Sequence, residues 1–307
     1  MARSKKSLRK PQAPLPQRLG VRPSYLRLPS PPWPDLLSFL IHKFPHIPAM
    51  QLKQRLAQGE FFDAQGQAIT LDTPYRAHTL LWYYRDVPEE APIAAQETII
   101  YQDDYILVAD KPHGLATAPG GQHVKETLVV RLRHQLNLPE LEAAHRLDKA
   151  TAGLVLLCKK AAYRGAYQQL FQQGQIKKVY HAIAPLHEDL QFPLVYRSRI
   201  IKGDPFFIMQ EVSGTPNSET HIALITQKNH LGLYQLIPIT GRQHQLRVHL
   251  AALGIPIQHD PWYPQIKAPT TQVSTELPLQ LLAFSLAFQD PITGNQHLFY
   301  SKNQLQL

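Results

Sequence analysis

Short apolar runs of strand length alternate with amphipathic runs of helix length from residue 96 to the end of the chain. Helical spacing marks the longer runs, and β-branched and aromatic content marks the shorter ones. The predicted elements are a hairpin over 98–101 and 105–108, helices over 126–135 and 160–172, and strands over 180–184, 221–226 and 233–239. This mixture predicts an α+β fold for a domain over residues 96–307.

A smaller α+β module is predicted to precede this domain, over residues 35–92. Leu36, Leu37 and Leu40 have the spacing of one helical face, and a second helix-like run follows Pro48. Short strand-like runs come after it, at 61–62, 69–71 and 80–84.

The first 34 residues differ in composition from the rest of the chain. They contain eight arginine or lysine residues, eight prolines and no acidic residue, whereas the other 273 residues hold 24 basic and 23 acidic side chains. Prolines disfavour helix interiors, and the segment has too little apolar surface to fold alone. We therefore expect residues 1–34 to be a flexible basic arm that binds nucleic acid; a solubilising tail or a cleaved transit peptide is the alternative.

Composition excludes several classes of protein. No run approaches the ~18 to 20 continuous apolar residues that a membrane-spanning helix needs. The single cysteine, Cys158, excludes an internal disulfide and favours a reducing compartment, so we expect a cytoplasmic protein. No Walker loop or Gly-x-Gly-x-x-Gly motif suggests a nucleotide cofactor.

A metal site is not expected either, although the chain has 15 histidines. His244 and His249 are five residues apart, which is roughly 140° around a helix, so they do not share a face. No carboxylate stands at the spacing of a His-Glu-x-x-His motif.

The first segment with the character of a reactive site is 142–158, where charged residues lead directly into an apolar strand. Arg146 and Lys149 flank Asp148, and this positive charge would keep the carboxylate ionised, as a nucleophile or a general base requires. Taken alone, however, the run favours an ion pair in a loop that only caps the strand.

The second such segment is 236–254. Thr240 and Gln243 have the spacing of a capping box, and Gly254 stands where a helix C-cap belongs, so a helix of about three turns is predicted. The cations of its first two turns are Arg242, His244 and Arg247. Because the helix macrodipole disfavours cations there, we expect an acidic side chain or a bound phosphate beside them; a solvated basic face is the alternative.

Five motifs, in order along residues ~96–307, resemble those of the RluA-type pseudouridine synthases. The most specific comprises His145-Arg146-Leu147-Asp148 and Thr151-Ala152-Gly153-Leu154, which is similar to the family's HRLDxxTSGLLL segment. The others are Lys111-Pro112-His113-Gly114-Leu115 (KPxGL), Lys178-Val179-Tyr180-His181-Ala182 (KxYxA), Gly241–His249 (GRxHQLRxH) and residues 256–263 (PIxGDxxY).

The resemblance implies an enzyme that isomerises uridine in RNA to pseudouridine, on a mixed, mainly antiparallel sheet with helices around it. The reaction exchanges a bond from ribose to a ring nitrogen for one to a ring carbon, so no cofactor or metal is implied. The resemblance makes Asp148 the nucleophile, Arg247 its charge partner and Tyr180 the ring that packs on the uracil. It leaves open whether Asp148 attacks the ribose or the ring, or removes a ribose proton.

The target base must leave the RNA stack, and Arg146 is expected to fill the vacated space. Further substrate-binding residues predicted from the motifs are His145, Leu147, Thr151, Arg242, His244, Leu246 and Lys111. The implied partner is ribosomal or transfer RNA, bound by a monomer without an obligate protein partner or a membrane. The alternatives are a non-catalytic RNA-binding or RNA-folding factor on the same scaffold, and an unrelated hydrolase that uses Asp148.

Two positions depart from the family pattern. Ala152 stands where Ser is usual, and His259 stands where Gly is expected, which puts the local turn in doubt. Residues 35–92 more faintly resemble an S-four-like RNA-binding module, with Ala64-Gln65-Gly66 in place of its asparagine-glycine turn.

Overall fold

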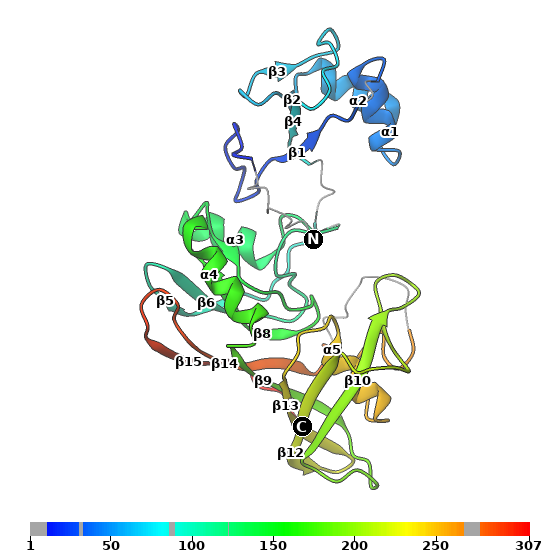
Figure 1. The fold of residues 1–307 in the computed structure, drawn as a ribbon, viewed down its shortest axis with the longest axis vertical. Coiled ribbons are helices and arrows are strands. Elements are labelled where there is room, and N and C mark those ends of the chain that lie inside the picture. Colours follow the sequence, from blue (N-terminus) through cyan, green and yellow to red (C-terminus); the bar gives the residue numbers. More distant parts are fainter. Residues whose placement is uncertain (1–10, 31–32, 86–89, 122, 267–276) are drawn as a thin grey trace, which may run out of the picture. The chain divides into compact units, whose positions relative to one another are not determined.

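The computed structural model describes residues 11–30, 33–85, 90–121, 123–266 and 277–307. The chain forms two compact units, Met1–Glu89 and Glu90–Leu307 (Figure 1). Within the described ranges, no helix has the length and hydropathy to cross a membrane.

The N-terminal unit is a small α+β module. Its helices are α1 (Leu36–Lys43) and α2 (Ala49–Ala57), and its strands are β1 (Ser24–Arg27), β2 (Phe61–Phe62), β3 (Ala68–Ile69) and β4 (Leu80–Tyr83), in the sheet order β1-β4-β2-β3. The Asp35 side chain caps α1 by accepting a hydrogen bond from the Ser38 amide. Leu40, Leu52 and Leu56 are fully buried in the core of this unit.

The prediction that residues 1–34 form a flexible arm is wrong for Ser24–Arg27, because these residues form strand β1. Strand β1 pairs along its whole length with β4 in antiparallel register, and Leu28 after it is buried. The four strand residues contain no proline, so their amides can join the sheet, and β4 supplies the apolar contacts that the segment lacks alone. Residues 1–10, with five of the cations, lie outside the described residues.

The C-terminal unit is built on one large sheet. Its strands are β5 (Thr98–Gln102), β6 (Ile106–Lys111), β7 (Glu142–Ala143), β8 (Ala152–Cys158), β9 (Lys177–Pro185), β10 (Leu194–Lys202), β11 (Met209–Val212), β12 (Ser218–Lys228), β13 (Leu231–Pro238), β14 (Leu281–Gln289) and β15 (Gln296–Tyr300). They follow the order β11-β10-β12-β13-β9-β14-β8-β6-β5, with β15 beside β14 and β7 beside β8. Among these described strands, only the pair β14–β8 is parallel, so the sheet is mixed and mainly antiparallel.

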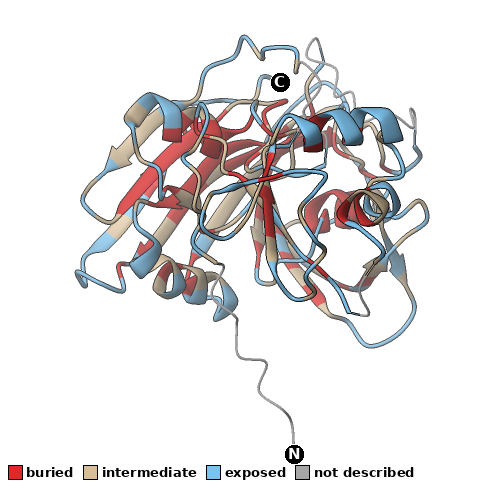
Figure 2. Cartoon of the chain, turned by 90° about the horizontal axis from the view of Figure 1, so that it is seen from above, coloured by how far each residue is buried: buried red, intermediate tan, exposed pale blue. Residues whose placement is uncertain are grey.

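Helices cover both faces of this sheet. Alternate residues of β6 and β8 pack on α4 (Ala161–Gln172), and the residues between them pack on α3 (Leu128–Leu136). The third helix, α5 (Gln245–Ala252), packs Leu246 and Leu250 on β9, β12 and β13. Strand β8 is buried at every position because it is covered on both faces, which explains its continuous apolar sequence. Buried residues accordingly follow the strands, whereas the loops are mostly exposed (Figure 2).

His249 ties α5 to the sheet. Its Nε2 lies 2.9 Å from Ser218 Oγ and 3.2 Å from Ser198 Oγ, and its Nδ1 lies 2.9 Å from Thr220 Oγ1. The side chain is fully buried, and this burial lowers the pKa of His249 to about 4. The ring is therefore neutral at pH 7 and bonded by three hydroxyl groups.

We expect His249 to make the folded chain less stable in acid. The unfolded chain takes up this proton near pH 6.5 and the folded chain only near pH 4, so the stability is complete above pH 6.5 and is lost progressively below it. The loss is about 1.4 kcal/mol per pH unit, or roughly 3 kcal/mol at pH 4. Urea unfolding between pH 7.5 and 4.5 measures it. His249→Gln should flatten this pH dependence, the exposed control His230→Gln should not, and equal slopes in all three chains would contradict the prediction.

Candidate active site

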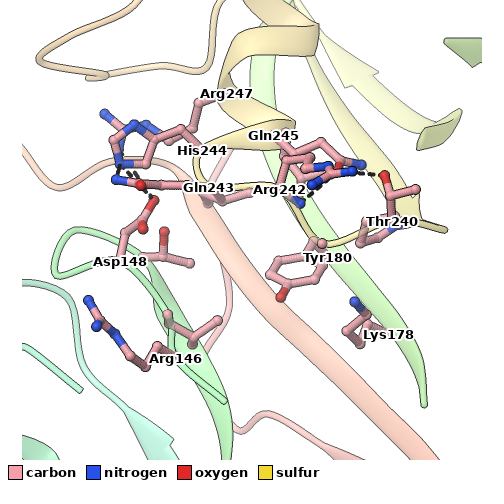
Figure 3. Close-up of a pocket in the computed structure, with 16 residues that line it drawn as sticks. Arg146, Asp148, Lys178, Tyr180, Thr240, Arg242, Gln243, His244, Gln245 and Arg247 are labelled. Carbon is pink, nitrogen blue, oxygen red and sulfur yellow. Dashed lines mark hydrogen bonds and ion pairs between the residues drawn. The ribbon is translucent and has the colours of Figure 1, made fainter. Parts of the chain in front are cut away.

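A pocket of ≈ 420 Å³ opens in the C-terminal unit between the loop before β8, strand β9 and the segment that leads into α5. Four arginine or lysine side chains line it against one carboxylate; these are Arg146, Lys178, Arg242 and Arg247, with Asp148 (Figure 3). The excess of cations suits a substrate that carries negative charge. The volume lies within the range of small-molecule sites.

The loop that carries Asp148 is held by two buried side chains. The Lys111 ammonium donates to the carbonyls of Leu115 at 2.7 Å and Lys149 at 3.3 Å. Thr117 donates its hydroxyl to the Leu147 carbonyl and accepts from the Leu147 amide. The two residues that flank Asp148 in the sequence, Leu147 and Lys149, are therefore both held by buried side chains. Burial lowers the pKa of Lys111 to about 7.

Gly153 allows the strand after this loop to approach β14 closely. Its φ is +114°, and a Cβ built there would lie 2.3 Å from the Ala283 carbonyl oxygen. Only glycine fits such a backbone at such a contact. Packing therefore explains why this motif has a glycine at position 153, since β8 and β14 pair there as parallel strands.

Arg247 connects Asp148 to a buried acidic partner. Its Nε and Nη2 each lie 2.7 Å from an oxygen of Asp260, and its Nη1 lies 3.4 Å from Asp148 Oδ2. Arg247 and Asp260 are almost fully buried, whereas the Asp148 side chain keeps 32% of its exposure. The bidentate pair fixes the guanidinium plane, so one N–H group points at Asp148. The anionic partners expected near this helix are thus two aspartates.

His244 lies on the other side of the same carboxylate. Its Nε2 is 3.7 Å from Asp148 Oδ2, and its Nδ1 is 2.8 Å from the Tyr263 hydroxyl, which accepts from the Met209 amide. The hydroxyl can then donate its proton to Nδ1, which favours the tautomer with the proton on Nε2, toward Asp148. Burial lowers the pKa of His244, so the ring is neutral at pH 7.

Tyr180 and Lys178 project from β9 along one wall of the pocket (Figure 3). They stand two residues apart on a strand and therefore share a face. Burial raises the pKa of the Tyr180 phenol, and the charge of Asp148 raises it further, so the phenol is protonated at neutral pH. Burial lowers the pKa of Lys178.

The capping box predicted at Thr240 and Gln243 is wrong. Helix α5 begins at Gln245, and its N-cap is His244, which has a left-handed φ of 54°. The Thr240 hydroxyl instead accepts from the Glu219 amide and donates to the Gln245 side chain. The Thr240 hydroxyl, which the sequence pattern assigned to the N-terminus of the helix, is therefore used to bind Glu219 and the Gln245 side chain. Of the three cations, only Arg247 lies inside α5.

The pocket gathers most of the predicted site residues. Its lining includes Asp148, Tyr180, Arg247, Arg146, Leu147, Thr151, Arg242, His244 and Leu246. Lys111 and His145 do not line it. Lys111 is fully buried behind the loop, and His145 turns inward, where its Nε2 accepts from the Leu156 amide at 3.1 Å and its ring stacks on Phe171.

Sequence reasoning missed three further residues of this site. Lys178 lines the pocket, and its place two residues before Tyr180 in the strand motif was a signal that could have found it. Asp260 and Tyr263 fix Arg247 and His244, although both lie in a motif that the sequence already singled out.

The departure at His259 is accommodated in the left-handed region, with φ 61°. Glycine occupies that region at little cost and histidine at a higher one, so the doubt about this turn concerned a real backbone requirement. Ala152 is fully buried at the start of β8.

A carboxylate with partial exposure, aimed into a cationic pocket and held by a fixed guanidinium, can act as a nucleophile or a general base. In the part of the chain that the structure describes, no group of three or more histidine, cysteine or acidic side chains is arranged to hold a metal ion.

Comparison with known proteins defines the class to which this fold and pocket belong. The model of the family described as RNA pseudouridylate synthase matches residues 105–252. The solved structure of human RNA pseudouridylate synthase domain containing 4 is 27% identical and covers 68% of this chain and 88% of its own, with a TM-score of 0.53. The predicted fold class is confirmed.

Comparison with curated relatives indicates a particular family within the pseudouridine synthases. The dual-specificity RNA pseudouridine synthase RluA of Vibrio vulnificus (strain CMCP6) is 35% identical over 61% of this chain and 76% of the relative. The protein of the same name from Escherichia coli (strain K12) is 33% identical over 66% of this chain and 90% of the relative. The chain belongs to the RluA-type pseudouridine synthase family, and it is an enzyme that isomerises uridine in RNA to pseudouridine.

Proposed function

We propose that this enzyme modifies uridines of ribosomal or transfer RNA and that Asp148 is its nucleophile. The observation that carries the proposal is the position of Asp148 in the pocket, 3.4 Å from a guanidinium that Asp260 holds in place. The names of the relatives support the substrate class, since the RluA proteins are called dual-specificity enzymes and another relative is called a ribosomal large subunit enzyme.

The pocket residues have distinct roles in this proposal. Arg247 holds Asp148 in position while the carbon–nitrogen bond of the target uridine breaks. Tyr180 packs on the uracil, and its protonated phenol lies near the ring carbon that forms the new bond and then loses its proton. Arg146 is exposed beside Asp148 and fills the place of the extruded base.

The substrate is tested in cells with and without the gene. Total RNA is treated with a carbodiimide that marks pseudouridine and is read by primer extension over ribosomal and transfer RNA. We expect at least one stop to vanish with the gene and to return with the wild-type chain. An unchanged stop pattern in both RNA pools would contradict the proposed substrate class.

We also propose that the N-terminal part of the chain binds RNA, through the cations of residues 1–34 and an S-four-like module at 35–92. A hollow of ≈ 660 Å³ in this unit supports the second assignment; its lining includes Arg18, Gln54, Gln58 and Arg85, together with Arg55, which is paired with Glu60. Arginine and amide side chains are suited to binding phosphates and base edges.

We expect the protein to be a monomer in a reducing, cytoplasmic setting, in which Cys158 stays a buried thiol.

Removing residues 1–10 is expected to weaken RNA binding and to make it less dependent on salt. The deletion removes five cations and keeps β1, which a deletion of all 34 residues would destroy. For every phosphate that these cations neutralise, the slope of log affinity against log salt should become shallower by roughly 0.7 to 0.9. Fluorescence anisotropy with labelled transfer RNA at several salt concentrations measures both quantities. A full-length chain with these five residues changed to glutamine is the matched control, and an unchanged slope in both chains would contradict RNA binding by the cations of residues 1–10.

A further inference from the structure

The turn between β10 and β11 presents an aromatic side chain to solvent. Phe206 is 84% exposed, and its ring centroid lies 5.8 Å from that of Phe207. Phe207 in turn contacts Trp262, with the ring centroids 5.2 Å apart. We call these three residues the aromatic ladder.

The aromatic ladder leads directly to the catalytic groups. The Trp262 ring centroid lies 4.9 Å from Cζ of Arg247 and 5.3 Å from the centroid of His244. Both of these side chains line the pocket that holds Asp148. Asp260, which binds Arg247, also accepts from the Trp262 amide at 2.9 Å. The Asp260 carboxylate therefore positions both Trp262, at the inner end of the ladder, and Arg247, which contacts Asp148.

The turn that carries Phe206 is preorganised. The Gly203 amide donates to the Ile208 carbonyl and the Ile208 amide donates to the Pro205 carbonyl, both at 3.0 Å. Behind the turn, the Met209 amide donates to the Tyr263 hydroxyl. A ring that is 84% exposed contributes almost nothing to folding through burial, although the backbone that carries it is well fixed. Its position is instead that of a contact surface for something outside the chain.

We propose that the aromatic ladder is a stacking surface for unpaired nucleotides that flank the target uridine. The charge of the neighbouring pocket selects RNA over an apolar protein partner, because the pocket has four cations against one carboxylate and suits phosphates. A flat, exposed ring beside a cationic groove is the combination that binds single-stranded nucleic acid, since every base has a face to stack. This inference rests on the proposed RNA substrate.

The stacking contact explains how an extruded uridine is retained. Once the target base leaves the helix, each of its neighbours is left with one uncovered face. An exposed ring on a preorganised turn, joined to the pocket residues through Phe207 and Trp262, restores such a contact at little entropic cost, because the turn backbone does not have to order on binding. Duplex RNA gains nothing from Phe206, because its internal base faces are already covered by neighbouring bases.

The test compares Phe206→Ala with Tyr300→Ala in the full-length chain. Tyr300 is 53% exposed on β15, whose partner β14 is separated from β10 by three strands, so it matches Phe206 in chemistry but not in location. The probes are a fluorescein-labelled single-stranded RNA of mixed sequence and the corresponding duplex. We expect Phe206→Ala to weaken binding of the single strand about tenfold, to leave duplex binding unchanged, and to raise KM for the cellular substrate with little change in kcat.

The outcomes separate this inference from the proposed function. If the wild type forms pseudouridine and Phe206→Ala binds the single strand as tightly as Tyr300→Ala does, the stacking surface is wrong and the proposed function stands. If Phe206→Ala weakens single strand and duplex equally, the contact is not stacking and the inference is again wrong. If the wild type modifies neither ribosomal nor transfer RNA, the proposed substrate fails, and the assignment of the ladder to that substrate fails with it.

Discussion

Changing Asp148 to asparagine is expected to lower the rate of pseudouridine formation by at least about a thousandfold. The amide cannot act as a nucleophile or take a proton, and loss of the attacking group of an enzyme commonly costs this much or more. The folded state should be kept, because the asparagine side-chain oxygen can still accept the hydrogen bond from Arg247. The measurements are single-turnover pseudouridine formation, RNA affinity and the urea midpoint.

The control for this variant is Asp104→Asn, which removes a carboxylate from an exposed loop of the same unit. It should leave the rate, the affinity and the midpoint near those of the wild type. An Asp148→Asn chain that binds RNA and turns it over at a rate within tenfold of the wild type would exclude Asp148 as the nucleophile.

Changing Arg247 to methionine is expected to damage both stability and activity. The side chain is 1% exposed and binds Asp260, which is 2% exposed, so its removal leaves a buried carboxylate without its cation. Breaking such a pair costs about 3 to 5 kcal/mol of unfolding free energy. Asp148 also loses its oriented partner, so we expect the rate under folding conditions to fall by roughly a hundredfold or more. Urea unfolding and single-turnover kinetics measure the two effects.

A second substitution separates the two effects of Arg247. In the double variant Arg247→Met with Asp260→Asn, the uncompensated buried charge is gone, so part of the stability should return. The rate should stay low, because the guanidinium beside Asp148 is still missing. A double variant that regains activity together with stability would mean that Arg247 acts only through folding, and its proposed role toward Asp148 would then be wrong.

The chain's own pattern predicted the elements whose signals are local. The buried strand β8 follows from seven apolar residues in a row, and β9 and α4 from their spacing. The hairpin β10–β11 was missed, although exposed Arg197 and Arg199 alternate with buried Ser198 and Ile200 at the period of a half-buried strand. The strand β1 was missed because its stability comes from pairing with β4, more than fifty residues away.

The active site likewise has features that local sequence signals predict and features that depend on distant contacts. Charge around Asp148 and the run of cations near α5 are visible along the chain, and residues of both segments line the same pocket. Their outcome was not visible: Thr240 binds across the sheet rather than capping a helix, His145 points into the core, and Lys111 supports the loop from behind. Each of these side chains has a polar group that could have served either purpose, and the neighbouring strand decided which.

The sequence by itself determined the residue types, the family motifs and the periodicity, because these are properties of residues close together along the chain. The family resemblance already implied that Arg247 pairs with Asp148, but only the tertiary structure shows how the two side chains meet across a separation of 99 residues, at 3.4 Å. That distance depends on the close approach of β8 to β14 at Gly153 and on the pairing of Arg247 with Asp260. Tertiary packing also connects Phe206 to the pocket residues through Phe207 and Trp262, because the β10–β11 hairpin packs on the Trp262–Tyr263 segment, which no local pattern encodes.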